Sequence, residues 1–139
     1  MPKILVVDDS ESVVASLEYI LQGESYEVVC AFSGAQALEI LKKETVDLVI
    51  TDIYMPPPDG IELMRAARAL RLNVPFIAMS SYASPMNMFV PARGLGARIS
   101  LEKPFSRECL IEAVQATLDA SLGGRFGTTN RNEFPNHEP

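Results

Sequence analysis

The feature that most constrains the fold is a short apolar segment, Leu48–Ile50, which leads through Thr51 to Asp52 and is soon followed by three prolines. A brief run of apolar, mostly β-branched residues is typical of a buried strand. Proline has no backbone N–H to give to a sheet, so Pro56–Pro58 prevent the strand from continuing. Asp52 is therefore expected where a strand stops, at the edge of a sheet.

The N-terminus repeats this arrangement, because the apolar segment Lys3–Val7 runs directly into Asp8 and Asp9. If the two strands are parallel neighbours, three carboxylates meet at one edge, with Lys103 as the cation expected nearby. Like charges about 4 Å apart repel by roughly 4 kcal/mol at an effective dielectric near 20. A hard divalent cation with oxygen ligands, of which Mg²⁺ is the first candidate, would relieve this repulsion.

Strand and helix patterns alternate along the rest of the chain. The expected strands are Lys3–Val7, Tyr26–Ala31, Leu48–Asp52, Phe76–Met79 and Ile99–Leu101. Helices are expected to begin at Ser10 or Ser12, Ser33, Asp59, Ser84 and Ser106, each before an apolar pattern of helical period. This alternation predicts an α/β domain with a parallel sheet covered by helices on both faces.

The helix that begins near Ser84 is expected to be short or kinked. Pro85 suits a first helical turn, but Pro91 would lie inside the helix and cost about 3 kcal/mol. Gly94 follows closely. The segment Ser84–Gly94 is therefore the least regular part of the predicted domain.

Length and composition are those of one ordinary globular domain, with 139 residues and 47% hydrophobic content. We expect a folded domain over residues 1–122 and a disordered tail over residues 123–139, which are poor in apolar residues. The net charge of −6 argues against direct nucleic-acid binding. The chain has neither a long apolar run nor a signal-peptide pattern, so we expect no membrane insertion and a cytoplasmic location.

Two further patterns are typical of ordinary structural roles. Cys30 and Cys109 are expected to be small buried residues rather than a disulfide or metal pair. Arg65, Arg68 and Arg71 recur at helical spacing and are expected on a solvent-exposed helix face, while Leu70 is expected on the inner side of the same helix.

Several short motifs, each at a predicted strand end or helix start, together resemble the receiver domain of bacterial response regulators. They are Val6–Asp9, Thr51–Pro56, Asp59–Gly60, Ser80, Gly96–Ala97 and Lys103–Phe105, and the resemblance covers about residues 2–121. It implies a flavodoxin-like (βα)5 doubly wound sandwich. The implied strand order is 2-1-3-4-5, the known order of that fold class.

The resemblance also implies a function. Asp52 would be the phosphoacceptor of a two-component relay, receiving its phosphoryl group from a histidine kinase or a histidine phosphotransfer protein. The chain would be a signalling switch rather than an enzyme, although it would promote its own phosphoryl transfer and dephosphorylation. Its output protein is unknown, and we expect a monomer or weak dimer. The sequence favours a stand-alone receiver over a piece of a longer protein.

Individual roles follow from the matched positions. Mg²⁺ would be held by Asp8, Asp9 and Asp52 together with the backbone carbonyl of Tyr54. Ser80 matches the hydroxyl residue that turns toward the phosphate. Lys103 matches the lysine of the active site, and Pro104 the proline after it, which often follows a cis bond.

Other positions depart from the family pattern. Ser100 stands where many members have a Tyr or Phe that rotates inward on activation, and Ser81 replaces a small Ala. Together with Pro91, these changes suggest an unusual output surface. Tyr54 and Tyr82 lie two residues after Asp52 and Ser80, so we hypothesise that their rings slow hydrolysis of the phosphoryl group. Alternatively, both rings point outward.

Two other classes of function fit the sequence less well. A degenerate receiver that binds proteins without being phosphorylated is disfavoured by the complete acidic set with Lys103. A small hydrolase with Asp52 as nucleophile would require a second Asp two residues later, where this chain has Tyr54.

Overall fold

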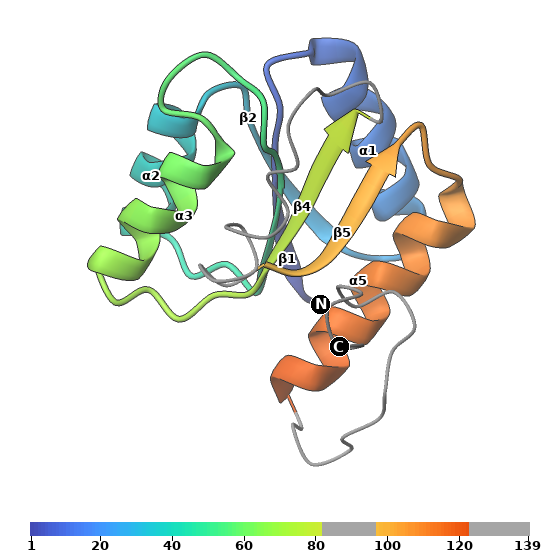
Figure 1. The fold of residues 1–139 in the computed structure, drawn as a ribbon. Helices are drawn as coiled ribbons and strands as arrows, with labels where there is room; N and C mark the ends of the chain where they lie inside the picture. Colours follow the sequence, from blue (N-terminus) through green and yellow to red (C-terminus); the bar gives the residue numbers. More distant parts are fainter. Residues whose placement is uncertain (82–96, 123–139) are drawn as a thin grey trace, which may run out of the picture.

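A computed structural model describes residues 1–81 and 97–122 of the chain. Its strands form one parallel five-stranded sheet in the order β2-β1-β3-β4-β5, which confirms the expected fold. Figure 1 shows β4 and β5 side by side in this sheet. The strands are β1 (Lys3–Val7), β2 (Glu27–Ala31), β3 (Leu48–Asp52), β4 (Phe76–Ser81) and β5 (Ala97–Lys103). The helices in the described ranges are α1 (Glu11–Gly23), α2 (Gly34–Lys43), α3 (Gly60–Ala69) and α5 (Arg107–Leu122).

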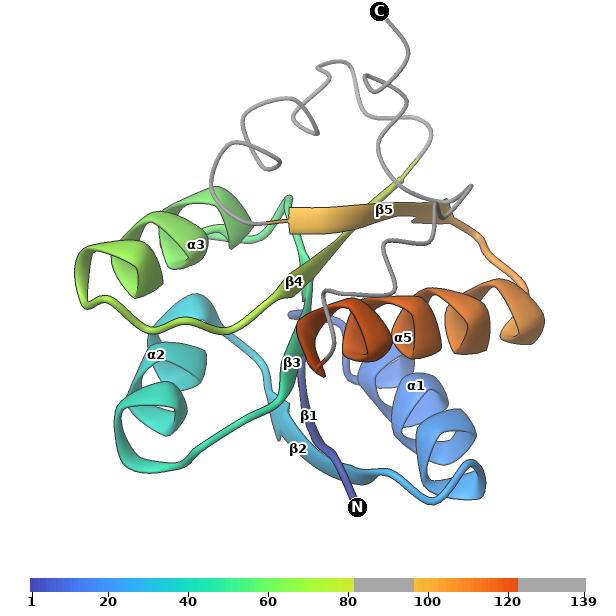
Figure 2. The same cartoon turned by 90° about the horizontal axis from the view of Figure 1, so that it is seen from below.

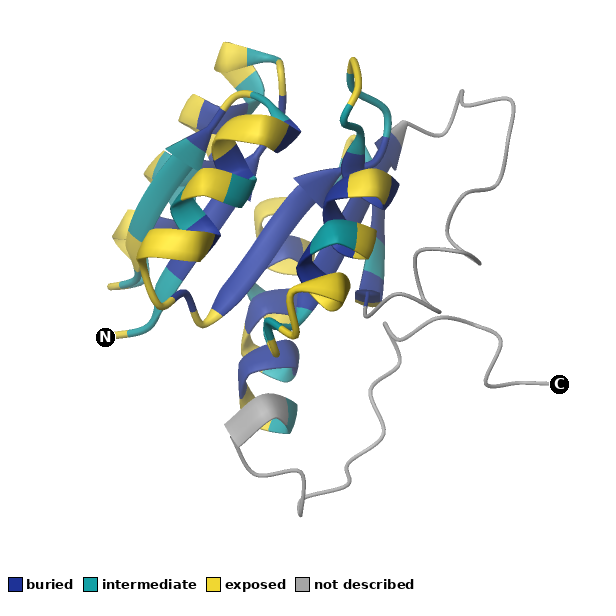
Figure 3. Ribbon diagram, turned by 90° about the vertical axis from the view of Figure 1, so that its left-hand side faces the viewer, coloured by how far each residue is buried: buried dark blue, intermediate teal, exposed yellow. Residues whose placement is uncertain are grey.

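The helices cover both faces of the sheet. Figure 2 shows α2 and α3 on one side and α1 and α5 on the other. Alternate residues of each central strand face opposite sides, so Leu5 and Val49 pack toward α2 and α3 while Ile4 and Ile50 pack toward α1 and α5. The two apolar layers explain why β1 and β3 are apolar along almost their whole length. In Figure 3 buried residues follow the central strands, and exposed residues lie on the outer helix surfaces.

The register of the central strands aligns their carboxyl ends. Val7 of β1 pairs with Thr51 of β3, so Asp8 and Asp52 both lie one residue beyond the same pair. On the other side of β3, Asp52 pairs with Met79 of β4, which places Ser80 just beyond that level. Residues far apart in the sequence therefore meet at one edge of the sheet.

The helix starts agree with the sequence signals. The side-chain oxygens of Ser10, Ser33 and Ser106 each accept a backbone N–H three residues later. Asp59 and Glu62 form a reciprocal capping box at the start of α3, with both hydrogen bonds at 2.8 Å. These local contacts define where each helix begins after the strand or loop that precedes it.

Three expectations about strand length and side-chain burial were wrong. β5 is longer than the predicted Ile99–Leu101, because pairing with β4 continues to the Ser81–Lys103 pair. Leu70 is 47% exposed, since α3 ends at Ala69 and the next residue leaves the helical pattern. Cys109 is exposed in the first turn of α5, although Cys30 is half-buried in β2.

The expected irregular helix over Ser84–Gly94 and the expected tail over residues 123–139 lie outside the described residues. Tyr82 and Gly96 also lie outside them. Among the helices that the structure describes, none combines the length and the hydropathy that crossing a bilayer requires.

Candidate functional site

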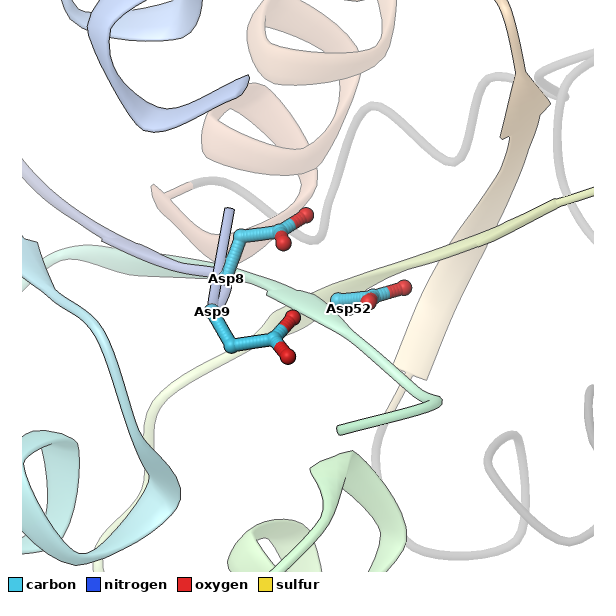
Figure 4. A group of neighbouring side chains, drawn as sticks. All are labelled: Asp8, Asp9 and Asp52. Carbon is cyan, nitrogen blue, oxygen red and sulfur yellow. The ribbon is translucent and has the colours of Figure 1, made fainter. Parts of the chain in front are cut away.

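Three carboxylates meet where β1 and β3 end. Asp8, Asp9 and Asp52 each place an oxygen within 4.8 Å of the others. Figure 4 shows Asp8 and Asp9 at the end of β1 extending toward the side on which Asp52 lies. Asp8 is 1% exposed and Asp52 is 6% exposed, whereas Asp9 is open to solvent. The sequence-based prediction that these residues meet is therefore confirmed.

Lys103 supplies the positive charge at this cluster. Its Nζ atom lies 2.7 Å from Oδ2 of Asp8 and 3.5 Å from Oδ1 of Asp52. The residue ends β5, the outer strand beyond β4, so its long side chain reaches across the edge of the sheet. The shorter contact is with Asp8, which makes this aspartate the primary partner of Lys103.

Asp8 is held on both carboxylate oxygens. Oδ1 accepts the backbone N–H of Ser10 at 2.9 Å, and Oδ2 accepts the ammonium group of Lys103. Its own backbone N–H donates to the carbonyl of Ala31 in the neighbouring strand, at 3.2 Å. Charged hydrogen bonds of this kind orient a carboxylate as well as stabilising it.

Asp52 lies in a less favourable environment. Burial, followed by the negative charge of Asp8, raises the pKa of Asp52 to about 6, against the opposing effect of Lys103. Desolvation and a neighbouring like charge both disfavour the ionised form. A cation or an added proton at this carboxylate would therefore relieve part of that cost.

The donor set fits a hard divalent cation. Among the residues that the structure describes, three carboxylates against one lysine leave two negative charges uncompensated if all three are ionised. Each ligand available from these side chains is an oxygen atom, the type that Mg²⁺ prefers. The arrangement thus provides both the charge and the chemistry for such an ion.

The backbone at Asp52 is fixed by the start of α3. The N–H of Gly60 donates to the carbonyl of Ile53 at 3.0 Å. A Cβ atom on Gly60 would lie 2.2 Å from the carbonyl oxygen of Asp52, closer than any real contact allows. The hydroxyl of Thr51 donates to the same carbonyl at 3.0 Å. Gly60 is therefore required for the close approach of α3 to the strand end.

A second close approach positions the proline-rich loop. A Cβ atom on Gly34, the first residue of α2, would lie 2.3 Å from the carbonyl oxygen of Pro58. The Pro57–Pro58 peptide bond is cis. Because this loop follows Asp52 and carries Tyr54, α2 determines how closely the loop packs beside the acidic cluster.

The remaining predicted residues lie around this edge. Ser80 is 5% exposed near the end of β4, and Ser100 is half-buried on β5, where it pairs with Ala78. Pro104 is exposed and follows a cis bond from Lys103, as expected from the resemblance. The backbone of Ser81 ends β4, and Tyr54 is partly buried against the core beneath α2 and α3.

Two residues at the site were missed by sequence reasoning. The sequence places Gly34 only directly after the expected helix start at Ser33, and Ser10 only at a possible helix start. A glycine at the first position of a helix does not itself indicate what packs against it. The backbone contact of Ser10 with Asp8 could have been expected, since an Asp side chain often accepts the N–H two residues later.

Comparisons with known proteins agree with this geometry. The sequence model of the response regulator receiver domain matches residues 4–115. A CheY-like receiver domain protein from Methanospirillum hungatei JF-1 is similar with a TM-score of 0.82 and 31% identity, covering 89% of this chain and 98% of that one. Chemotaxis protein CheY4 of Vibrio cholerae is similar with a TM-score of 0.78 and 32% identity, covering 85% of this chain and 99% of that one.

A longer protein also contains a domain of this kind. NtrX from Brucella abortus is similar with a TM-score of 0.81 and 28% identity, covering 89% of this chain but 28% of its own. Because the family match spans most of the sequence and the strand order agrees with it, the chain belongs to the response regulator receiver domains of two-component systems.

Proposed function

We propose that this protein is a phosphorylation-dependent switch in which Asp52 accepts a phosphoryl group from a histidine kinase or a histidine phosphotransfer protein. An oxygen of Asp52 forms a bond to phosphorus as the phosphorus–nitrogen bond of the donor phosphohistidine breaks. The released imidazole takes up a proton. The product is an aspartyl phosphate that changes how the protein binds its output partner.

One observation carries this proposal: three carboxylates share a small volume with a single lysine at the carboxyl edge of the sheet. In doubly wound sheets, ligands bind outside the carboxyl ends of the strands. A purely structural cluster would gain nothing from bringing two buried aspartates together. A site that receives a cation and a phosphoryl group requires that arrangement.

Asp8, Asp9 and Asp52 would hold Mg²⁺ together with the backbone carbonyl of Tyr54. When bound, the ion supplies charge neutralisation at the transferring phosphoryl oxygens. Asp8 keeps its orientation through Ser10 and Lys103, while Asp52 keeps its backbone fixed against Gly60. The chain's own contribution is thus to position the nucleophile before the donor arrives.

Lys103 and Ser80 would respond to the phosphoryl group. The ammonium of Lys103 lies within reach of Asp52, and Ser80 offers a hydroxyl donor from the adjacent strand. Charge-assisted hydrogen bonds contribute roughly 1.5–3 kcal/mol each. Shifting an equilibrium from 1:99 to 99:1 requires about 5.5 kcal/mol, so phosphorylation biases the switch and partner binding completes it.

The output surface would differ from that of many relatives. Ser100 cannot supply an aromatic ring that moves inward on activation, and Ser81 replaces a small Ala near the site. We expect signalling through protein contacts in the cytoplasm, by a monomer or weak dimer, from a domain that spans residues 1–122. Neither nucleic acid nor a membrane is expected to bind directly.

The lifetime of the phosphoryl group is proposed to depend on Tyr54 and Tyr82. Bulky rings two residues after Asp52 and Ser80 would hinder the water that attacks in line. Phosphorylated Tyr54→Asn/Tyr82→Ala protein should then lose phosphate faster than the parent in a mass-spectrometric time course. Equal rates of phosphate loss would show that neither tyrosine slows hydrolysis.

The phosphoacceptor itself is tested by intact-protein mass spectrometry after incubation with Mg²⁺ and acetyl phosphate. We expect one phosphoryl adduct that disappears with EDTA and in Asp52→Asn. Asp119→Asn, which removes an exposed carboxylate from α5, is the matched control and should be labelled normally. The absence of an adduct, or labelling of Asp52→Asn, would instead favour a phosphorylation-independent binding module.

A further inference from the structure

A cavity of about 490 Å³ lies at the opposite end of the sheet from the three aspartates. It is formed by the end of α3, the loop after it and the start of β4. Its lining includes the apolar residues Met64, Leu72 and Phe76 and the polar residues Arg68, Arg71 and Asn73. No acidic residue lines it in the described ranges, and its volume is within the range of roughly 300–1,000 Å³ seen for ligand sites.

Arg71 occupies a backbone conformation that disfavours its residue type. Its φ angle is 61°, in the left-handed region. The backbone N–H of Arg71 donates to the carbonyl of Arg68, and that of Leu72 donates to the carbonyl of Ala67. These two hydrogen bonds form a helix-ending motif in which the position of Arg71 is usually Gly, sometimes Asn. An arginine here costs backbone energy, and residues held in such sparsely populated conformations are concentrated at functional sites.

The cavity continues a row of positive charge on a negatively charged protein. Arg65, Arg68 and Arg71 are all exposed, at spacings of three residues, while the whole chain carries −6. Arg65 and Arg71 form no ion pair with any acidic residue that the structure describes. By contrast, Lys3, Lys103 and Arg107 each pair with acidic side chains. Two cations of the row thus remain available to a binding partner.

We propose that this surface binds an acidic peptide segment of a partner protein, with one apolar side chain in the cavity and carboxylates on the arginine row. Arginine pairs well with carboxylates, and arginine clusters are a common way to recognise acidic motifs. Arg65 and Arg68 are separated by a rise of roughly 4.5 Å along α3 at 1.5 Å per residue, and Arg71 follows two residues after the helix, so the row is longer than one small carboxylate. A peptide matches both the row and the cavity.

The site lies at the start of β4, whereas Asp52 and Ser80 lie at the carboxyl ends of the strands. Five residues of strand separate Phe76 from Ser81, a rise of roughly 16 Å. Binding at the cavity therefore goes beyond the proposed phosphoryl transfer and does not depend on it.

The test uses a short fluorescein-labelled peptide in which Glu residues flank a central Leu-Phe pair, with fluorescence anisotropy as the readout on the full chain. We expect binding that weakens as salt is raised, because exposed charges are screened. Arg71→Gly should reduce affinity about tenfold, the loss of one charge-assisted contact. Arg65→Gln should reduce it about threefold, as a residue at the rim of an interface.

Matched variants separate binding from folding. Ser25 has a φ of 70° in the same helix-ending motif after α1, so Ser25→Gly makes the same backbone change without touching the cavity. Arg107→Gln removes the same charge from α5, on the opposite face of the sheet. Both should bind the peptide like the parent, and Arg71→Gly should melt at or above the parent temperature.

Four results would overturn the proposal. One is a parent protein that does not bind the acidic peptide, and another is unchanged binding by both Arg71→Gly and Arg65→Gln. The third is equal binding of a peptide whose Leu-Phe pair is replaced by Gly-Gly, which would show that the cavity is not used. Asp52→Asn is measured in parallel, since lost binding there would assign the peptide to the phosphorylation site instead.

Discussion

The two ends of the sheet handle charge in opposite ways. At the carboxyl end, Asp8 and Asp52 are buried around one shared lysine, and burial raises the pKa of Asp52 to about 6. At the amino end of β4, arginines beside the cavity are exposed to solvent. A buried charged side chain therefore has a large effect on the stability of the protein, whereas an exposed one affects mainly the binding of partners.

The largest expected effect is the loss of the shared lysine. Lys103→Met should lower the free energy of unfolding by about 3–5 kcal/mol in EDTA, because it leaves Asp8 buried without its cation. Urea denaturation measures this, and added Mg²⁺ should restore part of the loss. Arg65→Gln removes an exposed charge and should change stability by less than about 0.5 kcal/mol. Equal losses of stability in the two variants would contradict the proposed difference between the buried and the exposed charges.

A steric change at the carboxyl end should come next. Gly60→Ala places a Cβ atom against the carbonyl of Asp52, so we expect a loss of about 2–3 kcal/mol. The matched control is Gly23→Ala, since nothing lies within 4 Å of a Cβ atom there. Mg²⁺ affinity, measured by its effect on the melting temperature, should fall in Gly60→Ala alone. Unchanged affinity would show that α3 does not position the proposed metal ligands.

Removing the carboxylate of Asp52 is expected to stabilise the protein, unlike the two substitutions above. Between its reference pKa of 3.8 and about 6, folded Asp52 holds more protons than unfolded Asp52, so stability falls as pH rises through this window. The cost persists above pH 6 and amounts to roughly 3 kcal/mol at most. In EDTA, Asp52→Asn should therefore be about 2 kcal/mol more stable than the parent at pH 7, with little difference at pH 4.

Thermal denaturation across this pH range checks the prediction, with Asp119→Asn as an exposed control. Mg²⁺ should stabilise the parent more than Asp52→Asn, since the variant has one carboxylate fewer at the cluster. A destabilised Asp52→Asn protein at pH 7 would mean that the contact with Lys103 outweighs burial and the charge of Asp8.

The smallest effect concerns a buried polar group of α5. Thr117 of α5 is 1% exposed, and its hydroxyl has no hydrogen-bond partner in the described structure. Thr117→Val should raise the free energy of unfolding by about 1 kcal/mol without changing phosphorylation. Urea denaturation and acetyl phosphate labelling check the two parts. A loss of stability would show that the hydroxyl is satisfied in solution.

Local patterns were enough to predict most of the fold and the main residues of the site. Pro56–Pro58 mark the loop after β3, and Ser10, Ser33 and Asp59 cap the expected helices. Such signals involve neighbours in the chain, so they can be interpreted without the tertiary structure. Even the meeting of Asp8 with Asp52 followed from one assumption, that the two strands are parallel neighbours.

Other features depended on residues far apart in sequence. Pairing with β4 decided how far β5 extends, and the contact of Gly34 with Pro58 decided how the loop beside the site is seated. The cavity beside Arg71 exists only because the end of α3 packs over the start of β4. The helical spacing of the arginines predicted that they are exposed, but it could not predict the cavity beside them.

The sequence by itself thus determined which chemical groups stand at the strand ends and helix starts. Only the tertiary structure decided that Lys103 lies closer to Asp8 than to Asp52 and that Asp52 has a raised pKa. The physical reason is that the position of a strand end depends on local backbone preferences. The pKa of a carboxylate depends instead on its burial and on its distance from the charged groups that folding brings near it.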